Sequence, residues 1–266
     1  MKWAIATIIL TRLFTPHIIR AENNDSTMVK ILLIEQRVMM ASDDTIKAIA
    51  LMSKANLYKE LNQYVEAAAT LNRINVEAIS SSLADEYYYQ RAFSLFMVGA
   101  HSEALLEFLN IKSNKNLNEE LKLLYLMLLL ENQRWDDFKN EYQNLASKDG
   151  TDSLLFKKEF ATPVLLEPDR YAKLSAQMPG LGMMKSGYFG RGLTSLGLQL
   201  FFVGFGVYNI SLTYYFTGVF SGLMPARKFY LGGKLLTHSL VEKKNQREIN
   251  DSKRKGYELI SHLFKY

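Results

Sequence analysis

Cysteine is absent from the 266-residue sequence, which excludes several kinds of site. The chain can form no disulfide bond, no thiolate metal site and no cysteine nucleophile, and it cannot carry a bacterial lipid anchor on cysteine. The four histidines show no His-x-x-x-His spacing, so no metal site is expected. The compartment stays open, because cytosolic and periplasmic proteins can both lack cysteine.

Motifs for catalysis and nucleotide binding are also missing. The Gly180-x-Gly182 pair lacks the third glycine of a dinucleotide-binding loop, and Gly187 is followed by Tyr188 where a phosphate-binding loop needs lysine. No Gly-x-Ser-x-Gly elbow occurs. We therefore expect no catalytic residue and no cofactor, and interpret the protein as a non-enzyme.

A strong charge imbalance is lacking as well, since the net charge is only +5. The basic residues are scattered through the first half of the chain and concentrated in its last 40 residues, without a basic face or a known reader motif. This distribution predicts no nucleic-acid partner and favours a position beside a membrane.

Proline is absent from Met28 to Leu145, and glycine is rare there. Apolar residues recur every three or four positions, which is the pattern of packed amphipathic helices and carries no strand signal. The sequence therefore predicts an all-α domain over residues 28–160. A linker over residues 161–178 follows it, in which Pro163 and Pro168 bracket an irregular connector.

The helical region contains a repeat. The aligned positions are Leu51, Ala55, Tyr58, Leu61, Tyr64, Ala67, Leu71 and Ile74 in the first copy; Tyr88, Ala92, Leu95, Val98, His101, Ala104, Phe108 and Ile111 in the second; and Leu126, Leu129, Trp135, Phe138, Tyr142 and Leu145 in a weaker third. Tyr58, Leu95 and Leu129 are 37 and then 34 positions apart, close to the tetratricopeptide period of about 34 residues.

These residues resemble the tetratricopeptide family where the fold needs small side chains and turns. The small residues are Ala55 and Ala67 in the first copy and Ala92 and Ala104 in the second. Asn62 and Gly99 fall at the turns between the paired helices, whereas Leu126 and Phe138 replace the small residues of the third copy. The resemblance implies stacked helical pairs with a concave surface that binds protein, the third pair splaying or capping the stack.

Charge is absent from Gly192 to Ala226, a run of 35 residues. A bilayer core of about 30 Å needs about 20 helical residues, so the run is too long for one span and barely enough for two. A polar break at residues 208–211 divides it, which predicts a short helical hairpin, shallow or re-entrant, with Gly218 and Gly222 packing against the first helix. An outer-membrane strand hairpin and a buried soluble hairpin are the alternatives.

The segments around this run resemble the membrane tail of a bacterial family of tetratricopeptide-containing proteins, common in Bacteroidetes and largely uncharacterised. The resemblance rests on a Pro-Gly-Leu-Gly motif, a glycine-spaced helix pair and a Tyr-x-Gly-Gly motif, with Met183 and Met184 replacing the usual Gln and aromatic residue. It implies a membrane hairpin over residues 179–237. The residues expected to form its turns and packing are Pro179, Gly180, Gly182, Gly187, Gly190, Gly192, Gly218, Gly222, Tyr230, Gly232 and Gly233.

Both ends of the sequence carry further signals. Residues 1–21 combine a charged start, an apolar centre and a small residue before a polar stretch, which predicts a signal peptide or an N-terminal anchor. Residues 238–266 form a basic amphipathic tail, interrupted near Gly256, that lies on a membrane or docks onto the repeats. An exported amino terminus conflicts with the basic hairpin flanks, which the positive-inside tendency would place in the cytoplasm. We favour export.

The run Tyr87, Tyr88 and Tyr89 is a candidate protein-binding surface, of which about one side chain should face the core. Taken together, the sequence predicts tetratricopeptide-like helical repeats, a hydrophobic membrane hairpin and a basic C-terminal helix. The expected function is a scaffold at the bacterial inner membrane, with its repeats in the periplasm, that binds membrane lipid and an unknown protein partner. The alternatives are a permanent subunit of a larger envelope complex, and an enzyme or transport component with an unrecognised site.

Overall fold

A computed structural model describes residues 22–111, 119–148 and 160–264, and the expected signal peptide lies outside these residues. Every regular element in the described part is helical, with no strand among them, so the all-α prediction is confirmed there. The chain divides into two compact units. Unit 1 comprises the described residues up to Ala161 together with those from Lys253 onward, and unit 2 comprises Thr162–Ser252.

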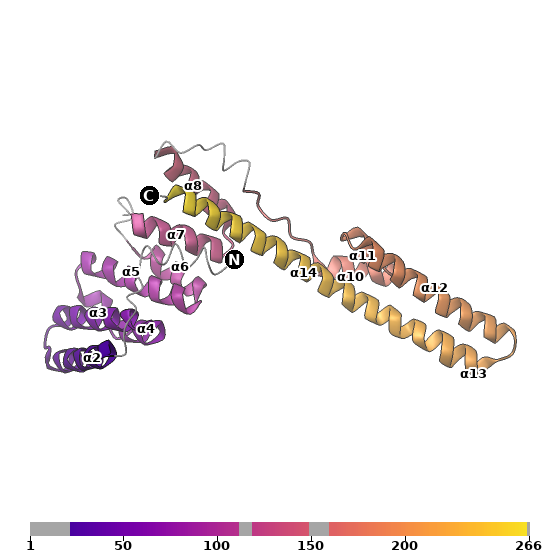
Figure 1. Cartoon of the computed structure of the whole chain (residues 1–266), viewed down its shortest axis with the longest axis horizontal. Coiled ribbons are helices and arrows are strands. Elements are labelled where there is room, and N and C mark those ends of the chain that lie inside the picture. The colour runs from indigo at the N-terminus through magenta and orange to yellow at the C-terminus, as the bar shows by residue number, and fades with distance from the viewer. Residues whose placement is uncertain (1–21, 112–118, 149–159, 265–266) are drawn as a thin grey trace. The chain divides into compact units, whose positions relative to one another are not determined.

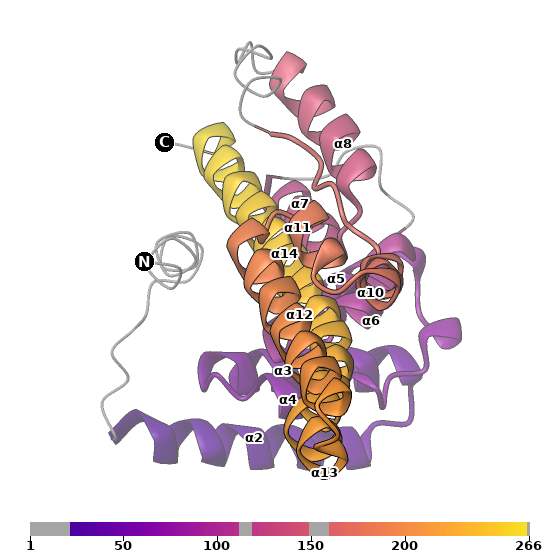
Figure 2. The same cartoon turned by 90° about the vertical axis from the view of Figure 1, so that its right-hand side faces the viewer.

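Unit 1 is a succession of helices in which each packs on the next along the chain (Figures 1 and 2). Its elements are α2 (Glu22–Met40), α3 (Asp44–Glu60), α4 (Tyr64–Leu71), the short 3₁₀ helix η1 (Val76–Ala78), α5 (Ser81–Val98), α6 (His101–Leu109), α7 (Glu119–Glu131) and α8 (Trp135–Lys148). The last part of α14 (Met224–Leu263), from Lys253 onward, also belongs to this unit.

Many of the repeat positions lie in the core of unit 1, although Val98 is 45% exposed. Six repeat positions are fully buried, with 0% exposure. They hold small residues in the first two copies (Ala55, Ala67, Ala92 and Ala104) and large residues in the third (Leu126 and Phe138). Alanine lets two helices approach closely, whereas leucine and phenylalanine fill a wider space. The third pair is therefore closed by large side chains, which is how it departs from the first two.

The turns between α3 and α4, α5 and α6, and α7 and α8 share one backbone geometry. Each has a residue of positive φ: Asn62 at 58°, Gly99 at 89° and Gln133 at 57°. The next amide donates to the carbonyl five residues earlier, over 2.8 Å from Gln63, 3.0 Å from Ala100 and 2.9 Å from Arg134. This is the Schellman arrangement, which satisfies the last carbonyls of a helix. Gln133 is the turn residue that the sequence did not indicate.

Unit 2 begins with α10 (Pro168–Gln177), which lies inside the segment 161–178 expected to be a linker. Only the part before Pro168 is irregular. Proline is favoured at the first position of a helix, where its missing N–H costs nothing, so Pro168 starts a helix rather than breaking one. Ala172 and Ser175 of α10 are buried, which makes this helix part of the unit.

The rest of unit 2 is a pair of long helical segments joined by a turn. They consist of α11 (Leu181–Lys185), α12 (Phe189–Ser211), α13 (Tyr215–Thr217), the π-helical segment η3 (Gly218–Leu223) and α14 as far as Ser252. Figures 1 and 2 both show α12 and the first part of α14 side by side. The π-helical turn adds a residue before Pro225, whose ring and missing N–H disfavour a regular α-helical turn there.

The polar break expected at residues 208–211 does not end the first helix. Asn209 donates from Nδ2 to the carbonyl oxygen of Phe205 over 2.8 Å, so its amide bonds the preceding turn and α12 continues to Ser211. The chain reverses only at Thr213, where φ is 69°. Gly256 likewise does not interrupt α14, contrary to the interruption expected in the tail.

The Schellman turn of unit 1 recurs twice in unit 2. Tyr188 donates to the carbonyl of Met183 over 2.8 Å after Gly187 (φ 101°), and Tyr214 donates to Asn209 over 2.9 Å after Thr213. In all five turns, buried residues where the two helices cross lie seven residues before and five residues after the residue of positive φ. The five sets are Ala55, Asn62 and Ala67; Ala92, Gly99 and Ala104; Leu126, Gln133 and Phe138; Gly180, Gly187 and Gly192; and Gly206, Thr213 and Gly218.

Candidate membrane-contacting surface

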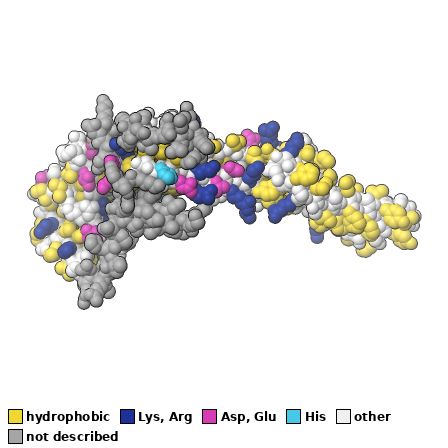
Figure 3. Space-filling model, turned by 45° about the horizontal axis from the view of Figure 1, so that its top comes forward, with side chains coloured by type: hydrophobic (Ala, Val, Ile, Leu, Met, Phe, Trp, Pro, Cys, Tyr) yellow, Lys and Arg dark blue, Asp and Glu magenta, His cyan; other side chains and the backbone are white. Residues whose placement is uncertain are grey.

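Among the described residues, one helix is long and apolar enough to cross a membrane, and it is α12. Only 11% of its most apolar window is buried. The large apolar residues exposed on α12 and on the segment that follows it are Phe189, Leu193, Leu198, Leu200, Phe201, Val203, Phe205, Val207, Tyr208, Leu212, Tyr214, Tyr215, Phe216, Val219, Phe220, Leu223, Met224, Phe229, Leu231, Leu235 and Leu236. Figure 3 shows hydrophobic side chains gathered over the part of unit 2 that contains α13.

Glycines bring the two segments of this surface into backbone contact. A Cβ on Gly218 would lie 2.8 Å from the carbonyl oxygen of Gly206, and one on Gly222 would lie 2.6 Å from the Gly206 nitrogen. Real Cβ atoms do not approach backbone this closely, so any larger residue at these positions forces the helices apart. The sequence indicated Gly218 and Gly222 but missed Gly206, whose spacing to Gly218 repeats that of Ala55 to Ala67.

The α11–α12 junction is built in the same way. Gly192 has space for no side chain, since a Cβ there would lie 2.5 Å from the carbonyl oxygen of Gly180. Gly180 itself has φ 79° and faces the Gly192 carbonyl. A Cβ on Gly182 would lie 2.6 Å from the Ser175 hydroxyl of α10. The glycine-rich run that begins after Pro179 therefore serves turns and helix contacts.

Two glycines of the expected set have no packing role. Gly190 and Gly232 have nothing within 4 Å of a Cβ built on them. A Cβ on Gly233 would lie 3.3 Å from the Ser195 hydroxyl, a tight contact that requires this side chain to move slightly. Tyr230 acts through its hydroxyl, which donates to the carbonyl of Ala176 over 2.8 Å and ties α14 to α10.

Buried polar groups hold the helices of unit 2 in register. Gln199 of α12 is 8% exposed and donates from Nε2 to the carbonyl of Ala226 over 3.2 Å. The hydroxyls of Ser175 and Thr237 lie 2.8 Å apart, fully inside the unit. Such bonds fix how far one helix slides along another, because a buried polar group without its partner costs about 1–3 kcal/mol.

The charges of unit 2 have one sign over a long stretch. No aspartate or glutamate occurs between Asp169 and Glu242. The exposed basic residues near the apolar surface are Arg191, Arg227, Lys228 and Lys234, and none of them has an ion-pair partner within the described part of the chain. Figure 3 shows basic side chains beside the apolar end of the molecule.

The tyrosine run of α5 divides between core and surface. Tyr87 is 2% exposed, and its hydroxyl accepts a hydrogen bond from Arg91 over 2.6 Å, so it is a core residue. Tyr88 packs edge-on against Tyr87 with ring centroids 5.2 Å apart. Burial, with the nearby Glu120 and Glu86 charges, raises the pKa of Tyr89 to about 12. Only the half-buried Tyr88 and Tyr89 remain available to a partner.

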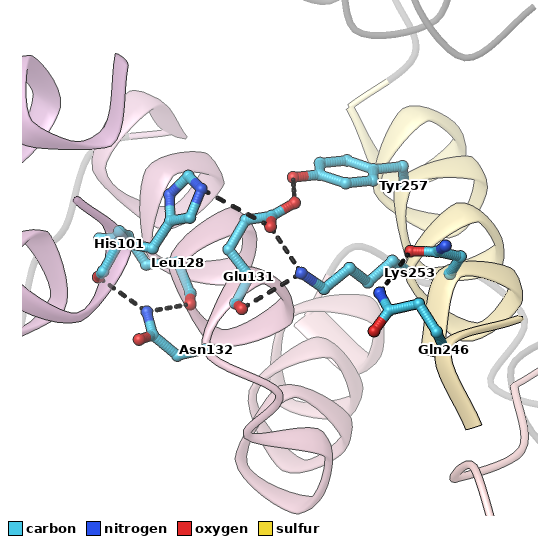
Figure 4. A network of polar contacts seen from close by, with 8 residues as sticks. His101, Leu128, Glu131, Asn132, Gln246, Lys253 and Tyr257 are labelled. Atoms are coloured by element: carbon cyan, nitrogen blue, oxygen red, sulfur yellow. Dashed lines mark hydrogen bonds and ion pairs between the residues drawn. The ribbon is translucent and has the colours of Figure 1, made fainter. Parts of the chain in front are cut away.

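A polar cluster that the sequence did not reveal lies in unit 1 (Figure 4). Glu131, at the end of α7, accepts hydrogen bonds from Lys253 over 2.6 Å and from the Tyr257 hydroxyl over 2.7 Å. His101 Nε2 lies 3.7 Å from the same carboxylate. A Cβ on Gly256, between these partners, would lie 2.5 Å from Leu130. The carboxyl-terminal part of α14 thus docks on α7, one of the two positions expected for the tail.

The cluster keeps its carboxylate ionised. Burial opposes ionisation of Glu131, but hydrogen bonds from Lys253 and Tyr257 and the Lys253 charge outweigh it and lower the pKa of Glu131. Burial and the adjacent Glu131 raise the pKa of Tyr257. Burial lowers the pKa of His101 and keeps its ring neutral at pH 7. Such a group holds two helices together, and no set of three or more metal-ligating residues occurs in the described residues.

No family model, no curated protein and no solved structure matches this chain.

Proposed function

We propose that the protein is a membrane-bound, non-enzymatic scaffold of the bacterial envelope. Unit 2 holds it at the inner membrane through the apolar surface of α12, α13 and η3. Unit 1, a tetratricopeptide-like array, presents a surface to a protein partner in the periplasm. The exposed apolar surface of unit 2 is the observation that carries the proposal.

Water is an unfavourable environment for that surface. Soluble monomers rarely expose a contiguous apolar patch larger than a few hundred Å². Leu200, Phe201 and Phe216 alone are 63–75% exposed. Because full burial of one such side chain is worth about 1.5–3 kcal/mol, the whole set favours transfer into lipid by well over ten kcal/mol.

Unit 1 supports the scaffold part of the proposal by its architecture. Stacked helical pairs offer extended surfaces for other chains. Large apolar side chains such as Val65 (61% exposed) and Leu106 (65% exposed) remain on the surface of this unit. We assign these side chains, together with Tyr88 and Tyr89, to the contact with the partner protein.

Vesicle flotation tests the membrane role. The chain carrying Phe201→Glu and Phe216→Glu should no longer float with vesicles, because two charges would enter the apolar surface. Leu106→Glu is the matched control in unit 1, since Leu106 is as exposed as Phe201, and it should float like the unmodified chain. Equal flotation of both variants would refute the proposal.

Two further experiments test the partner and the orientation. After extraction in mild detergent, Tyr88→Ala with Tyr89→Ala should lose a stoichiometric partner that Phe201→Glu retains. A chain that purifies alone with a bound small molecule would instead indicate a transport or enzymatic role. A reporter fused to the carboxyl terminus and active only outside the cytoplasm should be active, and activity of a cytoplasmic reporter would reverse the orientation.

A further inference from the structure

We infer that unit 2 enters one leaflet of an anionic bilayer, as far as the level of Arg227 and Lys228, and does not cross the membrane. This inference rests on the proposed membrane role and adds the depth of insertion and the lipid chemistry. It follows from the register of the two helical segments, the position of the basic residues and the absence of acidic ones.

The register places Arg227 and Lys228 beside the middle of α12. Gln199 bonds the carbonyl of Ala226, the residue before Arg227. Further along, Phe202 stacks on Phe229 with ring centroids 5.2 Å apart. An apolar helix of 23 residues is therefore paired with a segment that becomes basic halfway along it.

The part free of charge on both segments is too short for a crossing. Between Gln199 and Ser211 the helix rises about 18 Å, at about 1.5 Å per residue. On the other segment, the distance from Tyr215 to Ala226 is similar. A hydrocarbon core is about 30 Å thick, so this length fills slightly more than one leaflet.

A full crossing would submerge two exposed charges. With Arg191 and Lys234 at one headgroup layer, Arg227 and Lys228 would lie near the bilayer centre, where each costs about 2.5–3.5 kcal/mol. The segment between Asp169 and Glu242 contains no acid that could neutralise them. Insertion into one leaflet places Arg227 and Lys228 at the phosphates and Arg191 and Lys234 on the water side of them, where basic residues gain from an anionic surface.

The residues on the water side of Arg227 and Lys228 have a composition typical of the membrane interface. Arg191 and Lys234 alternate there with exposed Phe189, Phe229 and Leu235. Aromatic rings and long basic side chains both prefer this region, the former by their amphipathic rings and the latter by extending their charge to water. Unit 2 therefore has an apolar end and a basic collar, formed by Arg191, Arg227, Lys228 and Lys234.

A groove at Lys228 can hold part of a phospholipid. It has a volume of about 330 Å³ and is lined by Phe220, Met224, Pro225, Lys228 and Phe229. The ammonium of Lys228 can meet a phosphate, while the apolar wall that leads to Phe220 continues toward the tip and can hold part of an acyl chain. This arrangement matches a lipid whose headgroup is at the collar.

The tip is prepared for a water-poor environment. Asn209, Ser211 and Thr213 each donate to a backbone carbonyl within the tip, over 2.8, 2.7 and 2.6 Å. Their polar groups therefore keep hydrogen bonds without water. The exposed tyrosines at the tip, Tyr208, Tyr214 and Tyr215, would suit the far interface in a full crossing, and the depth measurement separates the two arrangements.

Depth can be measured on the full chain, because the absence of cysteine lets a single introduced cysteine carry a nitroxide label. Leu200→Cys places a label near the level of Arg227, Phe216→Cys places one at the tip, and Leu235→Cys places one beside Lys234, on the water side. In vesicles of phosphatidylcholine with phosphatidylglycerol, oxygen exposure of the label should be highest at Phe216, lower at Leu200 and lowest at Leu235.

The other outcomes are distinct. A maximum at Leu200, with the Phe216 label reduced by an impermeant reagent from the opposite side, would overturn one-leaflet insertion while keeping the membrane role. Labels that show no lipid contact at any of the three positions would overturn the membrane role itself.

Headgroup chemistry is tested by competition between vesicles. Arg227→Gln with Lys228→Gln should lower the preference for phosphatidylglycerol vesicles over pure phosphatidylcholine vesicles by roughly 25-fold, because each basic residue near an anionic surface contributes about 1 kcal/mol. Lys30→Gln with Arg37→Gln removes the same charge from α2 and should leave the preference unchanged. An equal loss in both double variants would refute the collar.

Discussion

Units 1 and 2 use the same turn between helices but close the helix pair with different residues. In unit 1 the helices joined at Asn62 cross at Ala55 and Ala67, whereas in unit 2 the helices joined at Thr213 cross at Gly206 and Gly218. Removing the methyl group lets backbone approach backbone, which is how helices associate when water does not drive them together. The contrast shows that one turn can join helix pairs whose crossing residues differ in size, from glycine in unit 2 to alanine, leucine and phenylalanine in unit 1.

The two units also treat charge differently. In unit 1, Glu35 is bonded by Lys54 over 2.6 Å and by Arg73 over 2.8 Å, and hydrogen bonds from Arg73 and Lys54 lower the pKa of Glu35 to about 2. In unit 2, Arg227 and Lys228 have no acidic residue nearby along the chain. The Glu35 charge is thus paired within unit 1, whereas Arg227 and Lys228 have no such partner within the described residues of unit 2.

The largest expected effect on stability comes from replacing a large buried residue of the third helix pair by alanine, the residue found at that position in the first two pairs. Phe138→Ala should destabilise unit 1 by about 3–5 kcal/mol, because Phe138 is fully buried and alanine leaves a cavity. Denaturant unfolding followed by the fluorescence of Trp135 measures it. Leu106→Ala, at an exposed position, should change little. A neutral Phe138→Ala would mean that the third pair can close as the first two do.

The next effect tests the glycine contacts of unit 2. Gly222→Leu should destabilise the packing of α12 on η3 by about 3 kcal/mol, because its Cβ would meet the backbone of Gly206. Hydrogen exchange of the α12 amides in detergent micelles reports the loss. Gly204→Leu is the matched control, since nothing lies within 4 Å of a Cβ there. Equal exchange in both variants would show that the close approach is not required.

A smaller effect is expected from the Glu131 cluster. Glu131→Gln should destabilise unit 1 by about 2 kcal/mol at pH 7, because it leaves Lys253 without its carboxylate partner. Since folding lowers the pKa of Glu131, its stabilisation is complete above the ordinary pKa of 4.5 and is lost as the pH falls through the folded value.

Unfolding curves recorded from pH 7 to pH 3 check this sign. The difference between the unmodified chain and Glu131→Gln should shrink below about pH 4.5. Glu103→Gln, on the exposed face of α6, is the control and should show a small difference at every pH. A stability difference that widens as the pH falls would contradict the conclusion that the carboxylate is ionised in the folded chain.

The smallest effect concerns the shared turn. Gln133→Gly should stabilise unit 1 by about 0.5–1 kcal/mol, because glycine accepts the φ of 57° without strain. Gly99→Ala, where φ is 89° and no atom lies within 4 Å of a Cβ, should cost about 1 kcal/mol through the backbone alone. Thr213→Gly should repeat the gain in unit 2. Thermal unfolding in detergent measures all three, and a gain for Gly99→Ala or a loss for either glycine substitution would show that the turns differ.

Much of the architecture was predictable from local patterns. Apolar spacing predicted the helices of unit 1, and the turn positions Asn62 and Gly99 were correctly identified. The glycines were assigned to turns and packing, but their spacing was not related to that of the repeats. The spacing of Gly180, Gly187 and Gly192 equals that of Ala55, Asn62 and Ala67.

Features that depend on distant residues could not be predicted in this way. Glu131 and Lys253 are 122 positions apart, and no periodicity relates them. The collar depends on the register between α12 and α14, which buried Gln199 fixes through a single hydrogen bond. The sequence did not reveal helix α10, because proline can either end or start a helix. The burial of Ala172 shows that the proline starts one here.

The division of the chain also sets an order of assembly. The core of unit 1 includes Leu259 and Ile260, with 2% and 0% exposure, which the ribosome adds after all of unit 2. Domains begin to fold as they emerge, from the amino-terminal side. Unit 1 therefore stays incomplete until the apolar stretch from Gly192 to Ala226 has been synthesised.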